Sequence, residues 1–211
     1  MKNCSWNDKK EEDFEKFEAI VDSIMKSGKG TQVIGAGGVG KSTLIRLCNK
    51  YCDDNELKYA NLAPTNKASR NINGSTIHKY FGMGYDCKMV SKKYQKFKSL
   101  DFVFIDEISM LNSQLLGCLS MAKVNNKNLK FVLLGDYRQL KPINEDKHLN
   151  SYVMKYLCDF NRLELTITKR FDEKLRKVSN DWYERGELDL SVFGKSVCVD
   201  RFLCYTNKKR R

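Results

Sequence analysis

Short apolar runs alternate with amphipathic segments along the chain, and this alternation predicts the fold. Four runs have the composition of buried strands: Thr31–Ile34, Tyr59–Ala63, Phe102–Ile105 and Phe131–Leu134. Helical patterns such as Ser42–Cys52 and Ser113–Lys123 lie between them, as expected for parallel strands with crossover helices. The runs are continuously apolar, which indicates a sheet that is covered on both faces. The sequence therefore predicts a doubly wound α/β fold with a mostly parallel sheet.

Three segments outside this alternation have patterns of their own. The opening stretch to about Lys10 is polar and is expected to fray, whereas the apolar residues of Phe14–Met25 recur with the period of an amphipathic helix. Residues 82–99 form a basic and aromatic insertion before the third strand. A second pattern of helix and strand begins later, so we expect a first domain at residues 1–150 and an incomplete second one at residues 151–211.

The composition limits the classes of protein to which the chain can belong. Its 211 residues are 41% hydrophobic, enough for one sizeable core, and the apolar runs are too short to cross a bilayer. We therefore expect an intracellular protein with no membrane partner. A formal net charge of +12 attracts polyanions, which favours a nucleic-acid partner over a mere effect on solubility. The eight cysteines are scattered without a C-x-x-C pair, which favours reduced thiols over disulfides or a zinc site.

One glycine-rich segment carries a specific chemical signature. Residues 35–42 read GAGGVGKS, which fits the phosphate-binding pattern G-x-x-x-x-G-K-S directly after a strand and directly before a helix. This context favours a nucleotide site over a glycine-rich turn without a ligand, because the backbone N–H groups and the helix N-terminus can face a phosphate. Lys41 is expected to bridge the β- and γ-phosphates of ATP, and the Ser42 hydroxyl to bind Mg²⁺. The expected nucleotide contacts are Gly35, Gly37, Gly38, Val39, Gly40, Lys41, Ser42 and Thr43.

A pair of carboxylates follows the third apolar run. Asp106 and Glu107 come directly after a strand, where a P-loop protein needs a carboxylate on the metal side. Asp106 is expected to hold Mg²⁺ through water, and Glu107 to polarise the attacking water. Such a pair is also common as a plain turn, but its place after a P-loop makes the signal specific.

A third polar cluster, GDYRQL at residues 135–140, follows the fourth apolar run. Because the carboxyl ends of parallel strands share one edge of a sheet, Gln139 can reach the γ-phosphate that Lys41 and Glu107 also face. A side chain at that position can report whether the phosphate is present. Taken alone, Gly135 and Asp136 are also compatible with a simple turn.

The order of these motifs resembles that of superfamily 1 DNA helicases, in particular the RecD-like and Pif-like group that moves 5′ to 3′ on single strands. The P-loop resembles their motif I, DEISM at residues 106–110 resembles motif II, and GDYRQLKP at residues 135–142 resembles motif III. This resemblance implies a RecA-like ATPase domain with ATP and Mg²⁺ as cofactors. It also implies single-stranded or forked DNA as a partner, together with replication or repair proteins.

Two further segments resemble elements that touch the single strand in this family. APTNKAS at residues 63–69 resembles motif Ia, and STIHKYF at residues 75–81 resembles the Thr-Ile-His element that follows it. The residues carried over as DNA contacts are Pro64, Thr65, Asn66, Thr76, His78 and Phe81. Polar groups at the start of the helix after the second strand can hold a DNA phosphate. His78 and Phe81 can add stacking worth about 1–3 kcal/mol per base, although His78 without the family pattern is more simply a structural histidine.

The resemblance continues beyond the first domain. LTITKRF at residues 165–171 resembles motif IV, which implies for Arg170 a contact with the γ-phosphate from the second RecA-like domain. The insertion at residues 82–99 occupies the place of the small 1B pin that splits duplexes in this group. The chain departs from the pattern at Lys16, near the place of an adenine-reading glutamine, and at Lys141, where a proline is usual. Because the later motifs are missing, we expect a fragment of a longer helicase or a degenerate relative.

Three functions are compatible with these observations. The first is an ATP-dependent DNA helicase that couples 5′-to-3′ translocation to hydrolysis, present as its first motor domain and the start of the second. The second is a nucleic-acid-binding P-loop ATPase without unwinding activity. The third, a P-loop nucleoside kinase, needs a substrate pocket and lid arginines that we cannot locate in the sequence.

Overall fold

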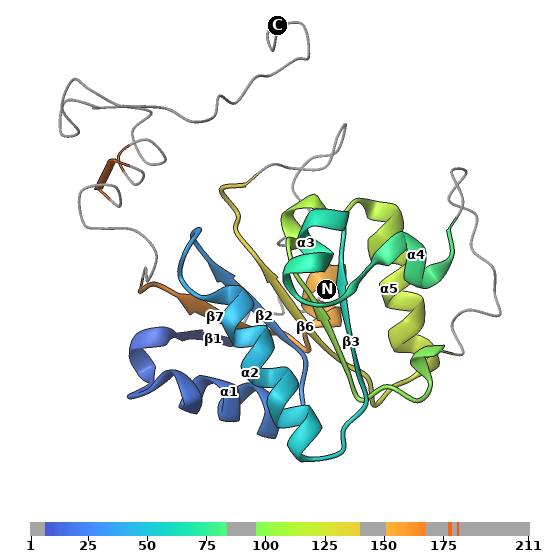
Figure 1. The fold of residues 1–211 in the computed structure, drawn as a ribbon, viewed down its shortest axis with the longest axis horizontal. Coiled ribbons are helices and arrows are strands. Elements are labelled where there is room, and N and C mark those ends of the chain that lie inside the picture. Colours follow the sequence, from blue (N-terminus) through green and yellow to red (C-terminus); the bar gives the residue numbers. More distant parts are fainter. Residues whose placement is uncertain (1–6, 84–95, 140–150, 168–176, 179–180, 182–211) are drawn as a thin grey trace, which may run out of the picture. The chain divides into compact units, whose positions relative to one another are not determined.

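A seven-stranded sheet is the centre of the computed structural model, which describes residues 7–83, 96–139, 151–167, 177–178 and 181. The strands are β1 (Asn7–Lys10), β2 (Thr31–Gly35), β3 (Tyr59–Ala63), β4 (Ser75–Thr76), β5 (Phe102–Ile105), β6 (Lys130–Gly135) and β7 (Asn161–Leu165). Their order across the sheet is β1-β7-β2-β6-β5-β3-β4, and every pair is parallel (Figure 1). The predicted α/β fold with a mostly parallel sheet is confirmed.

Helices cover both faces of the sheet, and the alternation of side chains along each strand divides the core in two. The helices are α1 (Phe17–Lys26), α2 (Lys41–Asp54), α3 (Asn66–Asn71), α4 (Ile77–Phe81), α5 (Ser113–Asn125) and α6 (Tyr152–Leu157). Along β5, Phe102 and Phe104 pack with α1 and α2, whereas Val103 and Ile105 pack with α4, α5 and α6. Each large apolar side chain buried in this way contributes about 1.5–3 kcal/mol. The two cores together hold the strand ends in fixed positions.

Strand β1 contradicts one expectation from the sequence. We expected the polar stretch to about Lys10 to fray, yet Asn7–Lys10 pair in parallel with β7 at the edge of the sheet. The Asn7 N–H donates to the Phe160 carbonyl at 2.7 Å, and Asp8 forms an ion pair with Arg162. Polar residues suit this position because all four side chains of the strand are exposed. Backbone pairing to a distant neighbour forms the strand, and a local hydrophobic pattern does not reveal such pairing.

Strand β7 extends the first structural unit beyond the expected boundary at residue 150. It lies between β1 and β2 in the sheet, and the α6 residues Met154 and Leu157 are buried in the same core as α5. The chain divides into one compact unit at Met1–Arg170 and another at Phe171–Arg211. The unit that contains the sheet therefore includes the helix and strand that follow residue 150. A second RecA-like domain after it stays a prediction.

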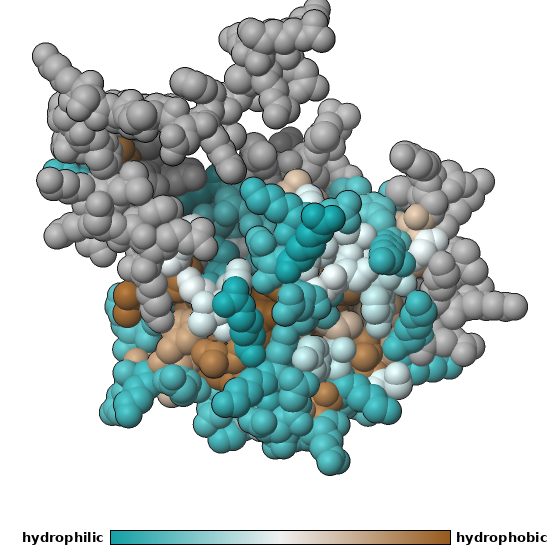
Figure 2. All heavy atoms as spheres, viewed as in Figure 1, coloured by the Kyte–Doolittle hydropathy of each residue, from teal (hydrophilic) through white to brown (hydrophobic). Residues whose placement is uncertain are grey.

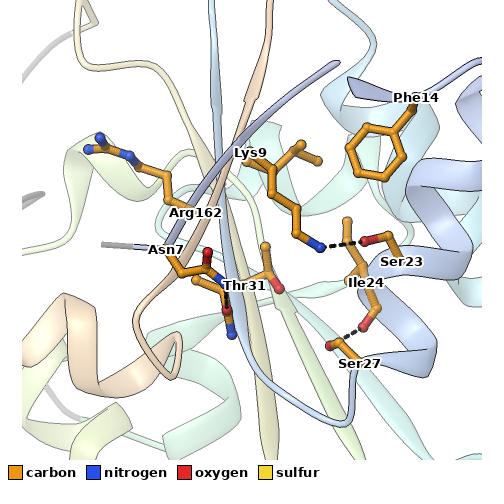
Figure 3. A pocket seen from close by; sticks show the side chains of 10 residues that line it. Asn7, Lys9, Phe14, Ser23, Ile24, Ser27, Thr31 and Arg162 are labelled. Carbon is orange, nitrogen blue, oxygen red and sulfur yellow. Dashed lines mark hydrogen bonds between the residues drawn. The ribbon is translucent and has the colours of Figure 1, made fainter. Parts of the chain in front are cut away.

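Hydrophilic side chains cover most of the described surface on the face shown in Figure 2. No helix in the described part of the chain combines the length and the hydrophobicity needed to span a membrane. A small pocket lies between β1, α1 and the start of β7, where Lys9 Nζ donates to Ser23 Oγ at 3.1 Å and Ser27 Oγ donates to the Ile24 carbonyl at 2.8 Å (Figure 3). Its volume of about 30 Å³ suits one or two water molecules and excludes a nucleotide.

Candidate nucleotide-binding site

The segments that follow four strands line an open pocket of about 440 Å³ at the carboxyl edge of the sheet. The P-loop follows β2, and the other walls come from segments after β3, β5 and β6. The residues that line the pocket are Gly37, Gly38, Gly40, Lys41, Ser42, Thr43, Arg46, Asn71, Asp106, Glu107 and Gln139. The structure thus brings together in one pocket five residues that the sequence predicted to act on a nucleotide: Lys41, Ser42, Asp106, Glu107 and Gln139.

The backbone of the P-loop explains why glycine recurs in it. Gly38 and Gly40 have φ angles of 85° and 100°, in the left-handed region that other residues rarely adopt, and α2 begins directly after Gly40. Of the nucleotide contacts expected from the sequence, Gly35 and Val39 do not line the pocket. The Val39 side chain is 1% exposed and packs in the core beneath the loop. Val39 can therefore offer a nucleotide only its backbone.

The Lys41 ammonium group lies within the P-loop. Its Nζ donates to the carbonyl oxygens of Gly35 at 2.7 Å and Ala36 at 2.9 Å, and the residue is only 8% exposed. Carbonyl dipoles compensate part of the cost of burying this charge. Phosphate oxygens carry a full negative charge and make stronger, charge-assisted hydrogen bonds. The lysine is therefore placed to exchange loop carbonyls for a phosphate.

Two oxygen ligands suited to Mg²⁺ lie side by side in the pocket. Ser42 Oγ donates to Asp106 Oδ2 at 3.5 Å, and Asp106 Oδ1 accepts a hydrogen bond from the Glu107 N–H at 2.9 Å. No group of three or more His, Cys, Asp or Glu side chains in the described part of the chain could hold a metal ion. Mg²⁺ in proteins keeps waters and uses substrate phosphates as further ligands. The donor set therefore fits Mg²⁺ that arrives with a triphosphate.

The Glu107 side chain is held in an unfavourable environment. Its Oε2 atom is buried with no hydrogen-bond partner, and its backbone φ of 56° is uncommon for a residue other than glycine. Burial raises the pKa of Glu107, as do the charges of Asp106 and Asp136, while the Lys41 charge lowers it. A half-buried carboxylate with a raised pKa at the wall of the pocket is suited to act as a general base toward water.

A tight turn after β6 brings Gln139 to the pocket. The buried Asp136 carboxylate accepts a hydrogen bond from the Arg138 N–H at 2.9 Å, and the Gln139 N–H donates to the Asp136 carbonyl at 3.2 Å. Tyr137 donates its hydroxyl to Gln32 Oε1 at 3.1 Å, which ties the turn to β2. Because β2 leads directly into the P-loop, the turn and the loop are held by one strand.

Two residues of the pocket, Arg46 and Asn71, were missed from the sequence. Arg46 lies four residues after Ser42 on α2, so the helical spacing that puts both on one face could have indicated it. Asn71 is the last residue of α3. A polar residue at the end of a short helix carries no signal of its own, so only the folded chain reveals its place at the pocket.

The segments expected to contact DNA begin at the same edge of the sheet. Thr65 and Thr76 start α3 and α4, where their hydroxyl oxygens accept hydrogen bonds from the N–H groups of Ala68 and Lys79, each at 3.2 Å. Asn66 is exposed, whereas Pro64 and His78 are half-buried. Their contacts with DNA stay a prediction.

Phe81 requires a correction. Its side chain is 1% exposed, and its ring stacks on that of Phe97 with a centroid distance of 4.9 Å. A ring enclosed in the core cannot stack on a base, so the expected DNA contact is replaced by a packing role. Most of the insertion at residues 82–99, together with Arg170, lies outside the described residues.

A P-loop between a central strand and α2, with carboxylates after β5 at the same sheet edge, defines a RecA-like P-loop domain. A model of the family described as AAA domain matches residues 16–192, and the chain belongs to this family.

The free and buried thiols of Cys48, Cys52, Cys118 and Cys158 agree with the expected reduced cysteines.

Comparison with individual proteins places the chain near Pif1-type helicases. It is 32% identical over 201 residues to the ATP-dependent DNA helicase RRM3 of Saccharomyces cerevisiae, covering 83% of this chain and 28% of that protein. It is 29% identical to the ATP-dependent DNA helicase Pif1 of Campylobacter jejuni, covering 93% of this chain and 51% of that protein. The chain is thus a distant homologue of Pif1 helicases over most of its length, and it spans about half or less of these relatives.

Solved structures of Pif1 helicases share the fold. The crystal structure of Pif1 from Candida albicans has a TM-score of 0.70 at 24% identity, covering 82% of this chain and 44% of that one. Bacteroides Pif1 bound to single-stranded DNA has a TM-score of 0.64 at 24% identity, covering 80% of this chain and 45% of that one. The resemblance to the Pif-like group of superfamily 1 is confirmed.

Proposed function

We propose that the unit at residues 1–170 is the ATP-hydrolysing motor domain of a DNA helicase that moves 5′ to 3′ on single-stranded DNA. One observation carries this proposal: the convergence of Lys41, Ser42, Asp106, Glu107 and Gln139 on a single pocket. Hydrolysis of a bound triphosphate needs a phosphate-binding cation, metal ligands, a group that orients water and a group that responds to the γ-phosphate. The names of the relatives, ATP-dependent DNA helicases, support the same function.

The chain's own residues divide the work of binding. Lys41 leaves the loop carbonyls to hold the β- and γ-phosphates, and the N–H groups of Gly38 and Gly40 line the loop around them. Ser42 and Asp106, whose oxygens lie 3.5 Å apart, would hold Mg²⁺. Bound Mg²⁺ supplies charge neutralisation and orientation of the triphosphate.

Glu107 and Gln139 act on the reacting end. The Glu107 carboxylate, which lines the pocket, orients a water molecule for attack and receives its proton, which the raised pKa of this carboxyl favours. Gln139 reports the presence of the γ-phosphate to the turn at Asp136 and Tyr137. Arg170 is proposed to stabilise the charge that develops on the phosphate during transfer.

The single strand is proposed to lie over the starts of α3 and α4. Pro64, Thr65, Asn66, Thr76 and His78 are the proposed contacts, and the net charge of +12 adds a general attraction to phosphate. Among the similar solved structures, one is Bacteroides Pif1 bound to single-stranded DNA, and another concerns DNA unwinding at forked double-stranded DNA by two coordinating Pif1 helicases. Single-stranded and forked DNA are therefore the substrates to test.

Hydrolysis of ATP in the presence and absence of a single-stranded oligonucleotide tests this function. We expect the strand to stimulate hydrolysis by the wild-type chain. Lys41→Ala should abolish turnover, because the ammonium that holds the phosphates is lost. Lys50→Ala is the matched control, since this exposed lysine lies on α2 away from the pocket and should leave the rate unchanged. Full turnover by Lys41→Ala would contradict the site, and a wild-type rate indifferent to DNA would contradict the motor.

Displacement of one strand from a fork with a 5′ single-stranded arm tests unwinding separately. A helicase that moves 5′ to 3′ should release the labelled strand only with ATP and only when the 5′ arm is present. A chain that hydrolyses ATP in response to DNA without releasing the strand would be a nucleic-acid-binding ATPase instead.

A further inference from the structure

Three polar side chains lie next to one another across the part of the sheet that ends in β1. Asp8, Arg162 and Gln32 are register partners on the adjacent strands β1, β7 and β2. Residues in register on parallel strands project from the same face of a sheet, and neighbouring strands lie about 4.8 Å apart. The next residues along β2 and β7, Val33 and Leu163, pack in the core with α1 and α2. The polar row therefore lies on the opposite face.

Tyr137 joins this row from the turn after β6. Its hydroxyl donates to Gln32 Oε1 at 3.1 Å, and Gln32 is fully buried. Burial raises the pKa of Tyr137, and hydrogen bonds with Arg162 and Gln32 oppose this effect. A guanidinium can only donate, so the Tyr137 oxygen accepts from Arg162. Arg162 in turn donates from Nε to the Asp8 carboxylate on the edge strand. The turn after β6 is thus tied to three strands.

The same turn carries Gln139 to the nucleotide pocket. Tyr137 precedes Gln139 by two residues, and Gln139 lines the pocket. Two hydrogen bonds to Asp136 hold the turn together: its carboxylate accepts from the Arg138 N–H at 2.9 Å, and its carbonyl accepts from the Gln139 N–H at 3.2 Å. A turn closed in this way moves as a unit, so the anchor at Tyr137 sets where Gln139 stands.

The choice of polar residues for this anchor indicates a demand for precise placement. A buried amide such as that of Gln32 costs free energy that its hydrogen bonds largely offset, so the network adds little net stability. Satisfied networks of this kind make one arrangement rigid, because each hydrogen bond has a preferred direction. A hydroxyl held from both β2 and β7 fixes the turn in one orientation.

We propose that Tyr137 and Arg162 are positioning residues that hold Gln139 at the γ-phosphate end of the pocket, with Asp8 on the edge strand as the anchor of Arg162. This inference rests on the proposed function, in which Gln139 meets the γ-phosphate. Tyr137 and Arg162 do not line the pocket, so they act on the hydrolysis step rather than on nucleotide binding. A misplacement of about 1 Å at such a group can slow a reaction by about 100-fold.

Single-turnover hydrolysis of Mg-ATP by the full chain, with single-stranded DNA present, tests this inference. Tyr137→Phe removes the hydroxyl and keeps the ring, and Arg162→Gln removes the guanidinium. Each should slow hydrolysis at least about tenfold, while the dissociation constant of a non-hydrolysable Mg-ATP analogue changes by less than about twofold.

Two control variants match these substitutions. Tyr59→Phe also removes a hydroxyl that donates to a side chain, that of Asp53 at 3.4 Å, but Tyr59 begins β3 at the edge of the sheet opposite the pocket. Glu164→Gln changes an exposed charge on β7, two residues after Arg162. Both should hydrolyse ATP at the wild-type rate.

Combination with Gln139→Ala separates positioning from a general loss of structure. If Tyr137 and Arg162 act through Gln139, their substitution should slow hydrolysis no further once the Gln139 amide is removed. A merely structural role would lower the rate by the same factor in both backgrounds. Thermal unfolding shows whether each variant folds, and Arg162→Gln carries the same test if Tyr137→Phe does not fold.

The outcomes distinguish this inference from the proposed function. Equal losses with and without Gln139→Ala would overturn the inference alone, as would wild-type rates in both single variants or a loss of nucleotide affinity that matches the loss of rate. A wild-type chain that does not hydrolyse ATP refutes the proposed function itself, and the positioning role with it.

Discussion

Two carboxylates, Asp106 and Asp136, and the Lys41 ammonium act on the charge of Glu107, and the balance between them sets how this residue works. Burial has the largest effect on its pKa, and neighbouring negative charges add to it. The Lys41 charge opposes both effects. The unpaired oxygen and the left-handed backbone show that the residue is not placed there for stability. Its position makes sense if it handles a proton during hydrolysis.

Glu107→Gln should separate binding from chemistry. The amide keeps the shape of the side chain but cannot accept a proton from water, so hydrolysis should fall by about 100-fold or more. Affinity for the Mg-nucleotide should stay within about threefold, because no binding ligand is removed. Single-turnover hydrolysis and a nucleotide titration measure the two quantities. Glu18→Gln, an exposed carboxylate on α1, is the control, and equal loss in both variants would contradict the role of Glu107.

The raised pKa of Glu107 also predicts how stability without nucleotide depends on pH. Between the ordinary carboxyl pKa and the raised one, the folded chain binds more protons than the unfolded chain, so stability falls as pH rises through this range. Glu107→Gln should therefore be more stable than wild type at neutral pH, by on the order of 1 kcal/mol, a size common for strained active-site residues. Thermal unfolding between about pH 4 and pH 8 should show this gap closing in acid. A gap of constant size would contradict the prediction.

At the scale of elements, the sequence located the buried strands well and the edge strands poorly. The predicted bounds of Tyr59–Ala63 and Phe102–Ile105 coincide with β3 and β5, because continuous apolar runs mark strands covered on both faces. Strand β1 is polar and the strand β4 has only two residues, so neither has a hydrophobic pattern. Both depend on a partner strand that local sequence does not name.

Some residues of the candidate site could likewise be predicted from the sequence, and others could not. Glycines, Lys41 and the Asp106–Glu107 pair were accessible from sequence, because phosphate chemistry requires those residue types at fixed spacing after strands. Asn71 lines the pocket only because α3 folds against β3. Phe81 is not at the expected DNA surface, because its ring is buried against that of Phe97. Contacts between segments far apart in the chain decide such cases.

The turn between α3 and β4 should tolerate no side chain at Gly74. An alanine there places its Cβ 2.2 Å from the Asn61 carbonyl oxygen, a backbone atom that cannot move without disturbing β3. Gly74→Ala should cost about 1–3 kcal/mol of unfolding free energy, the usual cost of overpacking. Chemical denaturation measures this cost.

Gly117→Ala is the matched control for that substitution. This glycine is exposed in the middle of α5, and an added Cβ would meet nothing within 4 Å. Alanine should raise stability by about 0.5–1 kcal/mol, because it restricts the unfolded chain and favours the helix. Equal changes in unfolding free energy for Gly74→Ala and Gly117→Ala would contradict the predicted clash at Gly74.

At the scale of the whole molecule, the charge of +12 predicts how DNA binding responds to salt. Neutralised phosphates release counterions, so affinity falls steeply as salt rises. Between about 50 and 200 mM salt, affinity for a single-stranded oligonucleotide should fall by orders of magnitude. Fluorescence anisotropy over this range measures the slope, with a nucleotide titration at each salt concentration as control. A flat response would exclude phosphate contacts as the main source of affinity.

The parallel sheet explains why the site lies where it does. Strands β2, β3, β5 and β6 run in one direction, so the segments after them meet at one edge although they are far apart in sequence. The two cores on either face hold these strand ends in register. Nucleotide chemistry and the proposed strand contacts therefore share a single rigid support, which is the arrangement that a motor domain requires.

Calorimetric titration of the chain with a non-hydrolysable Mg-ATP analogue tests the nucleotide pocket most directly. The wild-type chain should bind one molecule of nucleotide, and Lys41→Ala should weaken binding by about 100-fold, equivalent to about 2.7 kcal/mol. Lys50→Ala should bind like the wild type. Failure of the wild-type chain to bind, or equal affinity of wild type and Lys41→Ala, would contradict a triphosphate site at this sheet edge.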